Sequence, residues 1–323
     1  MNNERLVFVG TPEFAATALA GLLEANYQVV AVITQPDKKV GRKQILTASP
    51  VKRLAIEHEV PVLQPEKINS SEFLTELRKY QPDLIITAAY GQIFRQELLG
   101  LPRLGCINLH GSLLPRWRGA SPIQRAIMAG DQKTGISLMQ MDKGCDTGAV
   151  YTMQELLIEP NETADELFER MAVLARDILL KNLPAILRSE LEPKPQTPEE
   201  DACYAQMLKK EETEIDWHLT AESIHNQIRG LNSWPVATST YAGKRWKIWR
   251  SRVVEVDVSE LPANIKPGMI IANKKRLLVK AGDTISESTP CPCIQLEEIQ
   301  PAGKSKLVAS EVAHAYPVGS CFE

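Results

Sequence analysis

An Asn-x-His pair and one downstream carboxylate are the residues of this sequence best suited to chemistry. The pair is Asn108 and His110, in NLHGSLLPRWRG, and the carboxylate is Asp146, in MDKGCDTG. A carboxamide can donate hydrogen bonds to an oxygen that becomes anionic, and an imidazole can transfer a proton at neutral pH. A carboxylate can orient that imidazole and favour its charged form. The three side chains together suit acyl transfer without a covalent enzyme intermediate.

The residues around the pair indicate where it lies. Residues 104–109 form a short apolar run, and strand side chains alternate, so Asn108 and His110 should point to one side at the carboxyl end of a strand. Open parallel sheets bind ligands at that edge. The alternative, which the spacing supports about equally, is a pair of satisfied polar residues at a strand end. Ser112 fits a turn former or a ligand contact better than a nucleophile.

The first half of the chain alternates strand and helix patterns. This order predicts an α/β fold with a doubly wound, mostly parallel, Rossmann-like sheet. No G-x-G-x-x-G motif is present, so a dinucleotide site has little support. Thr163 and Glu166 form a capping-box pattern that opens a long amphipathic helix ending near Leu187. The expected strands are 6–9, 29–33, 84–88, 104–109 and 136–141, and the expected helices between them include 73–80 and 122–129.

A change of pattern separates a second domain. Residues 192–200, EPKPQTPEE, hold three prolines and no periodicity, which is typical of an extended linker. After a helical stretch around Ile224 and Ile228, short β-type runs predict a small barrel. We therefore expect domains at 1–189 and 209–323, joined by a linker at 190–208. The expected strands of the barrel are 238–241, 246–249, 252–258, 269–271, 277–279 and 294–299.

The composition is that of an ordinary globular protein, and the N-terminal sequence predicts that it stays in the cytoplasm. The 323 residues are 44% hydrophobic and 24% charged, with a net charge of −3. The N-terminus lacks the pattern of a signal peptide and no apolar run approaches a membrane span, so we expect no membrane contact. The six cysteines are scattered and predict reduced thiols. Cys291 and Cys293 lack a second pair at zinc spacing, so we expect a loop there and no metal.

One segment has the composition of a nucleic-acid surface. The basic stripe, residues 241–252 (YAGKRWKIWRSR), holds five cations, no acid and two tryptophans. Cations neutralise phosphates and aromatic faces stack on bases. The alternative is a hairpin with Trp246 buried and solvated charges on its other face. A pI of about 6.1 argues against indiscriminate nucleic-acid binding. The candidate contacts are Lys244, Arg245, Lys247 and Arg250.

The motifs together resemble those of a known family. HGSLLPRWRGASPIQRAI, with Asn108 ahead of it and D-x-G at Asp146 to Gly148, resembles the signature of the folate-dependent formyltransferases. GTPEFA, QPDKKVGRK, AAYGQI and IDW narrow the resemblance to the members that act on methionyl-tRNA. It covers nearly the full chain. It implies that Asn108, His110 and Asp146 are catalytic and that the C-terminal barrel is of the OB type and binds tRNA.

The resemblance also implies two substrates for a monomeric enzyme. 10-Formyltetrahydrofolate would occupy a crevice lined by residues 88–93 and 112–115, and initiator methionyl-tRNA would accept the formyl group. The basic segment KKVGRK, residues 38–43, would be a loop that reaches the acceptor end of that tRNA, although GRK followed by Ala48-Ser49-Pro50 departs slightly from the family pattern. The implied folate contacts are Tyr90, Ile93, Ser112, Leu113, Leu114 and Pro115, and the implied tRNA contacts are Arg42 first, then Lys38, Lys39 and Lys43.

Three other functions use parts of the same features. A formyltransferase acting on a small amine would use the trio without needing the basic barrel. A hydrolase that gives the formyl group to water would need neither IDW nor the C-terminal domain. A catalytically idle RNA-binding protein would keep the scaffold, but it would not need Asn108, His110 and Asp146 intact.

Overall fold

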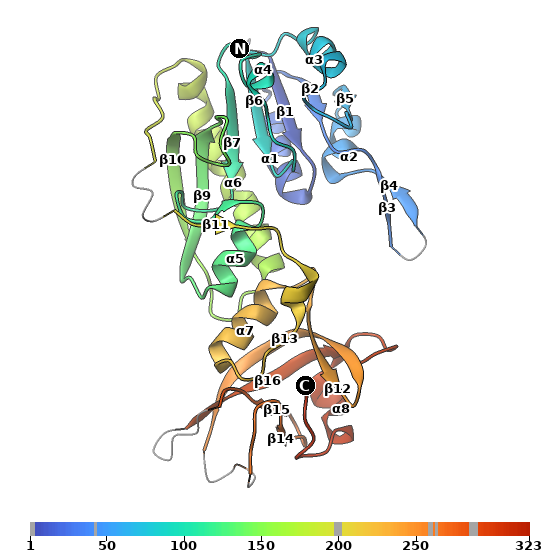
Figure 1. Ribbon diagram of the computed structural model, residues 1–323. Coiled ribbons are helices and arrows are strands. Elements are labelled where there is room, and N and C mark those ends of the chain that lie inside the picture. The colour runs from blue at the N-terminus through green and yellow to red at the C-terminus, as the bar shows by residue number, and fades with distance from the viewer. Residues whose placement is uncertain (1–3, 42–43, 197–201, 258–260, 262–263, 284–289) are drawn as a thin grey trace. The chain divides into compact units, whose positions relative to one another are not determined.

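The chain forms two compact units. The computed structural model describes residues 4–41, 44–196, 202–257, 261, 264–283 and 290–323 (Figure 1). The first unit comprises Met1–Pro122, Lys133–Leu157 and Phe168–Gln206, and the second comprises Ile123–Gln132, Ile158–Leu167 and Met207–Glu323. Two short segments that precede residue 168 therefore belong to the second unit. No helix among the described residues is long and apolar enough to cross a membrane.

The first unit contains the mostly parallel sheet that the sequence predicts. Its order is β10-β9-β7-β6-β1-β2-β5, in which β5, β2, β1, β6 and β7 run parallel and β9 pairs antiparallel with both β7 and β10. The chain order reverses between β1 and β6, so a topological switch point lies there. The strands are β1 (Leu6–Gly10), β2 (Val29–Ile33), β5 (Val62–Leu63), β6 (Leu84–Ala88), β7 (Cys106–His110), β9 (Lys133–Gln140) and β10 (Val150–Leu157).

Helices α1 to α4 connect the parallel strands, and the predicted capping box opens α6, the longest helix, which follows β10. The backbone N–H of Thr163 donates to Glu166 Oε2 at 2.9 Å, and the Glu166 N–H donates to Thr163 Oγ1 at 3.4 Å. The two side chains satisfy N–H groups that the first helical turn leaves unpaired. The helices are α1 (Glu13–Glu24), α2 (Pro50–Glu57), α3 (Ser71–Arg78), α4 (Gln96–Leu99), α5 (Pro122–Met128) and α6 (Ala164–Leu187).

Two short pairings in the first unit escaped the sequence analysis. β3 (Lys38–Val40) and β4 (Ile45–Thr47) form an antiparallel ribbon that extends away from the main sheet (Figure 1). The predicted basic loop is therefore partly a hairpin. β8 (Arg118–Gly119) pairs in parallel with β11 (Tyr204–Ala205), which lies within the predicted linker. Runs of two or three residues are too short to show a periodicity.

The second unit is the small β-barrel that the sequence predicts. Its strands lie in the order β12-β13-β16-β15-β14, with β17 beside β16. The C-terminal segment closes the sheet, because Phe322 bridges Tyr241 at the end of β12 and Cys321 bridges Met269 beside β14. The elements are η2 (Lys210–Thr213), α7 (Ala221–Gly230), β12 (Ala237–Tyr241), β13 (Lys244–Val256), β14 (Ile270–Ala272), β15 (Leu277–Lys280), β16 (Cys291–Gln300), β17 (Leu307–Val308), α8 (Ala309–Val312) and η4 (Ala313–Ala315).

Two sequence predictions for the barrel were wrong. Residues 246–249 and 252–258 were expected as separate strands, but β13 is continuous from Lys244 to Val256, with its pairing register shifting between Ile248 and Ser251. Such an irregularity interrupts the alternation without ending the strand. Residues 291–293 were expected as a loop, but they begin β16, and both Cys291 and Cys293 are buried in an apolar cluster. Burial raises the pKa of the Cys293 thiol to about 12.

A buried histidine on α7 should make the second unit sensitive to acid. His225 Nδ1 lies 3.0 Å from Ser251 Oγ, and Nε2 lies 3.2 Å from the Pro160 carbonyl oxygen. Burial lowers the pKa of His225. The unfolded chain, with a histidine pKa of about 6.5, therefore takes up this proton first, so stability is full above about pH 6.5 and falls as the pH drops toward the lowered folded value.

We expect His225→Gln to lose less stability than the parent protein between pH 7.5 and 5.5. Thermal unfolding at a series of pH values measures the difference, whose slope is at most about 1.4 kcal/mol per pH unit for one proton. His314→Gln is the matched control, because His314 is an exposed histidine of the same unit. Equal acid sensitivity in His225→Gln and in the parent would contradict the assignment.

Candidate active site

The three predicted chemical residues lie together at the carboxyl end of β7. Asn108 Nδ2 donates to Asp146 Oδ1 at 3.3 Å, and His110 Nδ1 lies 3.5 Å from Asp146 Oδ2. Asn108 and His110 are two residues apart on one strand, so they project to the same side of the sheet. Asp146 comes from the loop between β9 and β10. The fold thus joins a carboxamide, an imidazole and a carboxylate that are 38 residues apart at their widest separation.

The imidazole of His110 is held on both sides. Its Nε2 lies 2.8 Å from the Trp117 carbonyl oxygen, while Nδ1 faces Asp146. Only the doubly protonated ring can donate to both of these acceptors. The side chain is 5% exposed, so its orientation is determined by these partners and by packing.

Ser112 stabilises the turn that follows β7 through hydrogen bonds. It is fully buried, and its hydroxyl donates to the Arg116 carbonyl oxygen at 2.6 Å. The Ser112 carbonyl in turn accepts from Ser137 Oγ at 2.7 Å. This supports its interpretation as a turn former and gives no sign of an activated nucleophile.

Backbone groups and a linker glutamine hold the loop that carries Asp146. The Gly119 N–H donates to Asp146 Oδ2 at 2.9 Å, which orients the carboxylate. Gly119 has φ +111°, and a Cβ there would lie 3.0 Å from the Ala205 carbonyl oxygen, so the position favours glycine. Gln196 Nε2 donates to the carbonyl oxygens of Asp146 and Gly148, at 2.7 and 2.8 Å.

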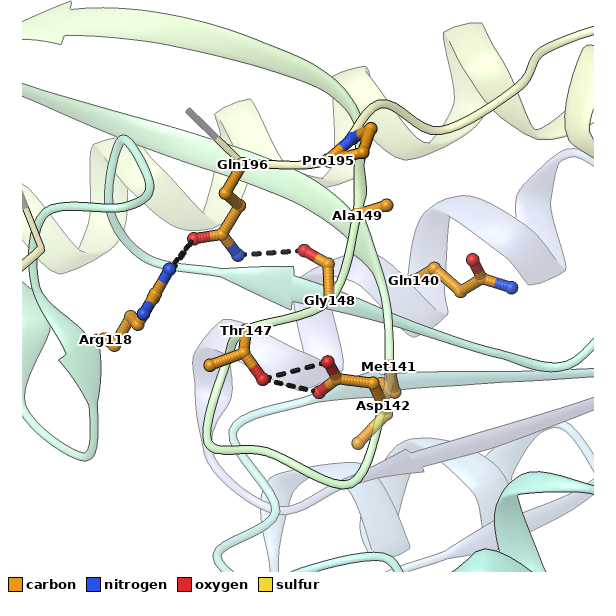
Figure 2. Close-up of a pocket in the computed structure, with 9 residues that line it drawn as sticks. All are labelled: Arg118, Gln140, Met141, Asp142, Thr147, Gly148, Ala149, Pro195 and Gln196. Atoms are coloured by element: carbon orange, nitrogen blue, oxygen red, sulfur yellow. Dashed lines mark hydrogen bonds between the residues drawn. The ribbon is translucent and has the colours of Figure 1, made fainter. Parts of the chain in front are cut away.

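A cavity of about 320 Å³ adjoins this loop (Figure 2). Figure 2 shows Arg118 joined to Gln196 and Gln196 joined to Gly148 across one part of its wall, while Thr147 bonds Asp142 across another. The Arg118 side chain is buried, and polar atoms line much of the cavity. The lining residues are Arg118, Gln140, Met141, Asp142, Thr147, Gly148, Ala149, Pro195 and Gln196.

Sequence reasoning missed Arg118 and Gln196. Arg118 lies inside the quoted RWRG segment, but nothing in its spacing indicates that it is buried. Gln196 lies in a proline-rich stretch that predicts an extended linker, and its hydrogen bonds to residues 146 and 148 depend on contacts distant in sequence. No local signal marks a side chain of that kind.

Comparison with known proteins decides the family. The sequence profile of the formyl transferase family matches residues 4–183, and the profile of its C-terminal domain matches residues 207–317. The methionyl-tRNA formyltransferase of Enterococcus faecalis is 40% identical over 95% of this chain and 94% of its own length. That of Caldanaerobacter subterraneus is 43% identical over 98% of this chain and 99% of its own. The chain belongs to the methionyl-tRNA formyltransferase family.

Solved structures share the fold of this formyltransferase at lower identity. A methionyl-tRNA formyltransferase from Clostridium thermocellum is 20% identical, with a TM-score of 0.54, and the match covers 77% of this chain and 93% of that one. The sugar 3N-formyl transferase WlaRD, solved in the presence of dTDP and 5-N-formyl-THF, is 18% identical with a TM-score of 0.64. That match covers 94% of this chain and 100% of that one.

The folate contacts implied by the formyltransferase resemblance fall into two groups. Ser112, Leu114 and Tyr90 are buried against the protein, so their side chains present little surface to a ligand. Burial raises the pKa of Tyr90 to about 12. By contrast Ile93 is 75% exposed, and Leu113 and Pro115 are half-buried. A ligand in the predicted crevice would therefore contact the side chains of Ile93, Leu113 and Pro115. From Ser112, Leu114 and Tyr90 it would contact mainly the backbone.

The two basic segments expected in a tRNA-binding formyltransferase differ in what surrounds them. Lys38 and Lys39 are exposed on β3, whereas Arg42 and Lys43 lie outside the described residues. Exposed apolar side chains share the ribbon with these lysines. They are Val40, Ile45 and Leu46.

In the basic stripe, two of the five cations form ion pairs with carboxylates from elsewhere in the chain. Arg250 pairs with Glu166, and Arg252 Nε lies 3.3 Å from Glu297 Oε1. Arg245 Nη2 donates to the hydroxyls of two threonines, Thr213 and Thr238. Among the described residues, no carboxylate pairs with Lys244, Arg245 or Lys247. These three are therefore the better candidates for phosphate contacts, and Arg250 is a weaker one.

Only one of the two tryptophans in the stripe remains a candidate for stacking. Trp246 is 4% exposed and packs against the rings of Tyr241, Tyr316 and Phe322 in the barrel core. The burial of Trp246 agrees with the alternative interpretation of this segment, a hairpin with Trp246 buried and charged side chains on its other face. Trp249 is half-buried, with the Lys247 ammonium 5.7 Å from its ring centroid.

Among the described residues, no three His, Cys, Asp or Glu side chains are grouped so that they could hold a metal ion. The sulfur atoms of Cys291 and Cys293, the pair considered for zinc, lie 4.0 Å apart.

Proposed function

We propose that this protein transfers the formyl group of 10-formyltetrahydrofolate to the free amino group of initiator methionyl-tRNA. The product is N-formylmethionyl-tRNA, which is used to start translation. Family membership over nearly the whole chain supports the reaction and the acceptor. The single structural observation behind the proposal is the convergence of Asn108, His110 and Asp146 at the end of β7.

The chemical step needs a positioned amine and a stabilised oxyanion. An α-amino group has a pKa of about 7.7 to 8.0, so a usable neutral fraction exists near pH 7. That amine attacks the formyl carbon, and the carbonyl oxygen becomes anionic in the tetrahedral intermediate. Asn108 donates a hydrogen bond to that oxygen from Nδ2, and His110 donates one from Nε2 when the oxyanion replaces the Trp117 carbonyl oxygen as its acceptor. One such donor can be worth roughly 3 kcal/mol.

Asp146 has two roles in this proposal. It holds His110 in place through Nδ1 and so orients the ring nitrogen that donates to the oxyanion. It also assists transfer of the proton that the attacking amine loses, through a water molecule, to the folate nitrogen. The new C–N bond forms at the amine and the old C–N bond breaks at that folate nitrogen, which leaves as the protonated amine of tetrahydrofolate. The proposed steps use Asn108, His110 and Asp146 and involve no metal ion.

The donor is placed beside the trio. Ile93, Leu113 and Pro115 offer apolar surface to its rings, and the cavity beside the Asp146 loop offers polar groups. Ligand pockets commonly combine apolar walls with a few oriented polar groups. Ser112, Leu114 and Tyr90 contribute mainly by holding the turn and wall in place.

The acceptor tRNA is bound by the two basic segments. Lys38 and Lys39 on the β3–β4 ribbon, with Arg42 and Lys43 of the same segment, contact its acceptor end. Lys244, Arg245 and Lys247 contact phosphates elsewhere on the tRNA. We retain residues 1–189 as the catalytic domain, 190–208 as the linker and 209–323 as the tRNA-binding domain of a monomer.

One assay tests the reaction and separates it from its alternatives. Donor labelled in the formyl group is mixed with charged initiator tRNA, charged elongator tRNA or small amines, and the labelled product is measured. We expect label on initiator methionyl-tRNA at a rate far above the other acceptors. Label on small amines alone would assign a different acceptor, and release of formate without any acceptor would assign a hydrolase.

A further inference from the structure

The side chain of a linker glutamine, Gln196, donates hydrogen bonds to the backbone of the loop that carries Asp146. One amide nitrogen, Gln196 Nε2, donates both to the Asp146 carbonyl oxygen at 2.7 Å and to the Gly148 carbonyl oxygen at 2.8 Å. A single side chain therefore spans the loop on either side of residue 147. The Asp146 carboxylate itself faces the other way, toward Asn108, His110 and the Gly119 N–H.

The glutamine is held in turn by a buried guanidinium. Arg118 donates to Gln196 Oε1 from Nε at 3.1 Å and from Nη2 at 2.8 Å (Figure 2). Arg118 is 6% exposed, so its guanidinium is a fixed anchor. The linker backbone reinforces the contact, because Lys194 and Val150 exchange two N–H to carbonyl hydrogen bonds of 2.8 and 2.9 Å.

The hydrogen bonds from Gln196 stabilise an unfavourable backbone conformation at Asp146. Asp146 has φ +54°, a left-handed conformation that residues with a side chain adopt at a cost. Hydrogen bonds to its carbonyl group and to that of Gly148 stabilise this conformation and so set the direction of the carboxylate. We propose that Gln196 is a positioning residue of formyl transfer that acts through Asp146, an inference that rests on the proposed role of Asp146.

Two other roles for Gln196 make different predictions. A purely structural linker contact would affect stability and leave the turnover of the folded enzyme unchanged. A direct ligand contact is the second alternative, because Gln196 lines the cavity, and its loss would raise KM for the folate donor with little change in kcat.

The first test is Gln196→Met, which keeps the length of the side chain and removes both its donor and its acceptor. We expect kcat to fall about tenfold, because a small displacement of a catalytic group costs this much or more. KM for donor and tRNA should stay within about twofold. Gln154→Met is the matched control, because Gln154 is an exposed glutamine of β10 in the same unit. Unchanged kcat in folded Gln196→Met, or a rise in KM alone, overturns the proposal.

Gln196→Glu covers the case in which the methionine variant fails to fold. Its carboxylate retains an acceptor for Arg118 and loses the two donors to the Asp146 loop. We expect the same loss of kcat as in Gln196→Met, because the proposal assigns the effect to those donors. Full activity of folded Gln196→Glu overturns it.

A double-mutant cycle shows whether Gln196 acts through Asp146. In the background of Asp146→Ala, adding Gln196→Met should change kcat by less than about twofold, because residues that act as a unit are not additive. A further tenfold loss in the double variant would show independent action and overturn the inference. Normal turnover of Asp146→Ala alone would instead refute the proposed catalytic role of Asp146, so the two failures are distinguishable.

Discussion

Alanine at Asn108, His110 or Asp146 is expected to lower kcat for formyl transfer about a hundredfold or more while leaving the fold intact. Asn108→Ala and His110→Ala each remove a donor to the developing oxyanion. Asp146→Ala removes the partner of His110 Nδ1 and a proton carrier. The measurements are single-turnover rates with labelled donor and methionyl-tRNA, together with thermal unfolding of each variant.

The three variants should also show that the residues work as a unit. Any double variant of the trio should be little slower than the more damaged single variant. His58→Ala is the matched control for His110→Ala, since His58 is an exposed histidine of the same unit. Near-normal turnover in a folded variant would remove that residue from the mechanism.

Replacing Lys244, Arg245 and Lys247 together by glutamine is expected to weaken tRNA binding strongly and to flatten its dependence on salt. Each cation that neutralises a phosphate contributes about 0.9 to the slope of log K against log salt concentration, so three contribute up to about 2.7. The measurement is tRNA affinity at several salt concentrations.

The chain offers a control with the same change of charge. Lys274, Lys275 and Arg276 are two lysines and an arginine, all exposed, in the same unit. Replacing these by glutamine should leave the salt slope close to that of the parent protein. Because Arg245 also bonds two threonine hydroxyls, the variant with only Lys244 and Lys247 replaced separates charge from local structure. An unchanged slope in both stripe variants would show that these residues do not neutralise tRNA phosphates.

The sequence predicted the main sheet well because its strands carry a strong local signal. β2 and β6 have the expected bounds, and β6 is buried along its whole length, as a central parallel strand should be. The capping box at Thr163 also forms as predicted. Short pairings such as β3–β4 and β8–β11 could not be predicted, because two or three residues carry no period and their partners are set by tertiary contacts.

The basic stripe illustrates what a linear pattern leaves out. The stripe contains no acid in the sequence, yet the fold brings Glu166 and Glu297 to two of its arginines. Trp246 belongs to the core because β12, β13 and the C-terminal segment enclose it, and its neighbours in sequence give no sign of that. Which cations and which ring face solvent depends on pairing between distant strands.

The sequence by itself determined the family, the alternation of strands and helices in the first half, and the three residue types able to stabilise and protonate a reacting carbonyl. These are properties of local patterns and of side-chain chemistry, which the linear sequence displays. Only the tertiary structure decided that Asp146 meets Asn108 and His110, and that Gln196 reaches back to hold the Asp146 loop. The reason is that hydrogen bonds between residues 38 and 50 positions apart exist only after the intervening chain has folded and brought them together.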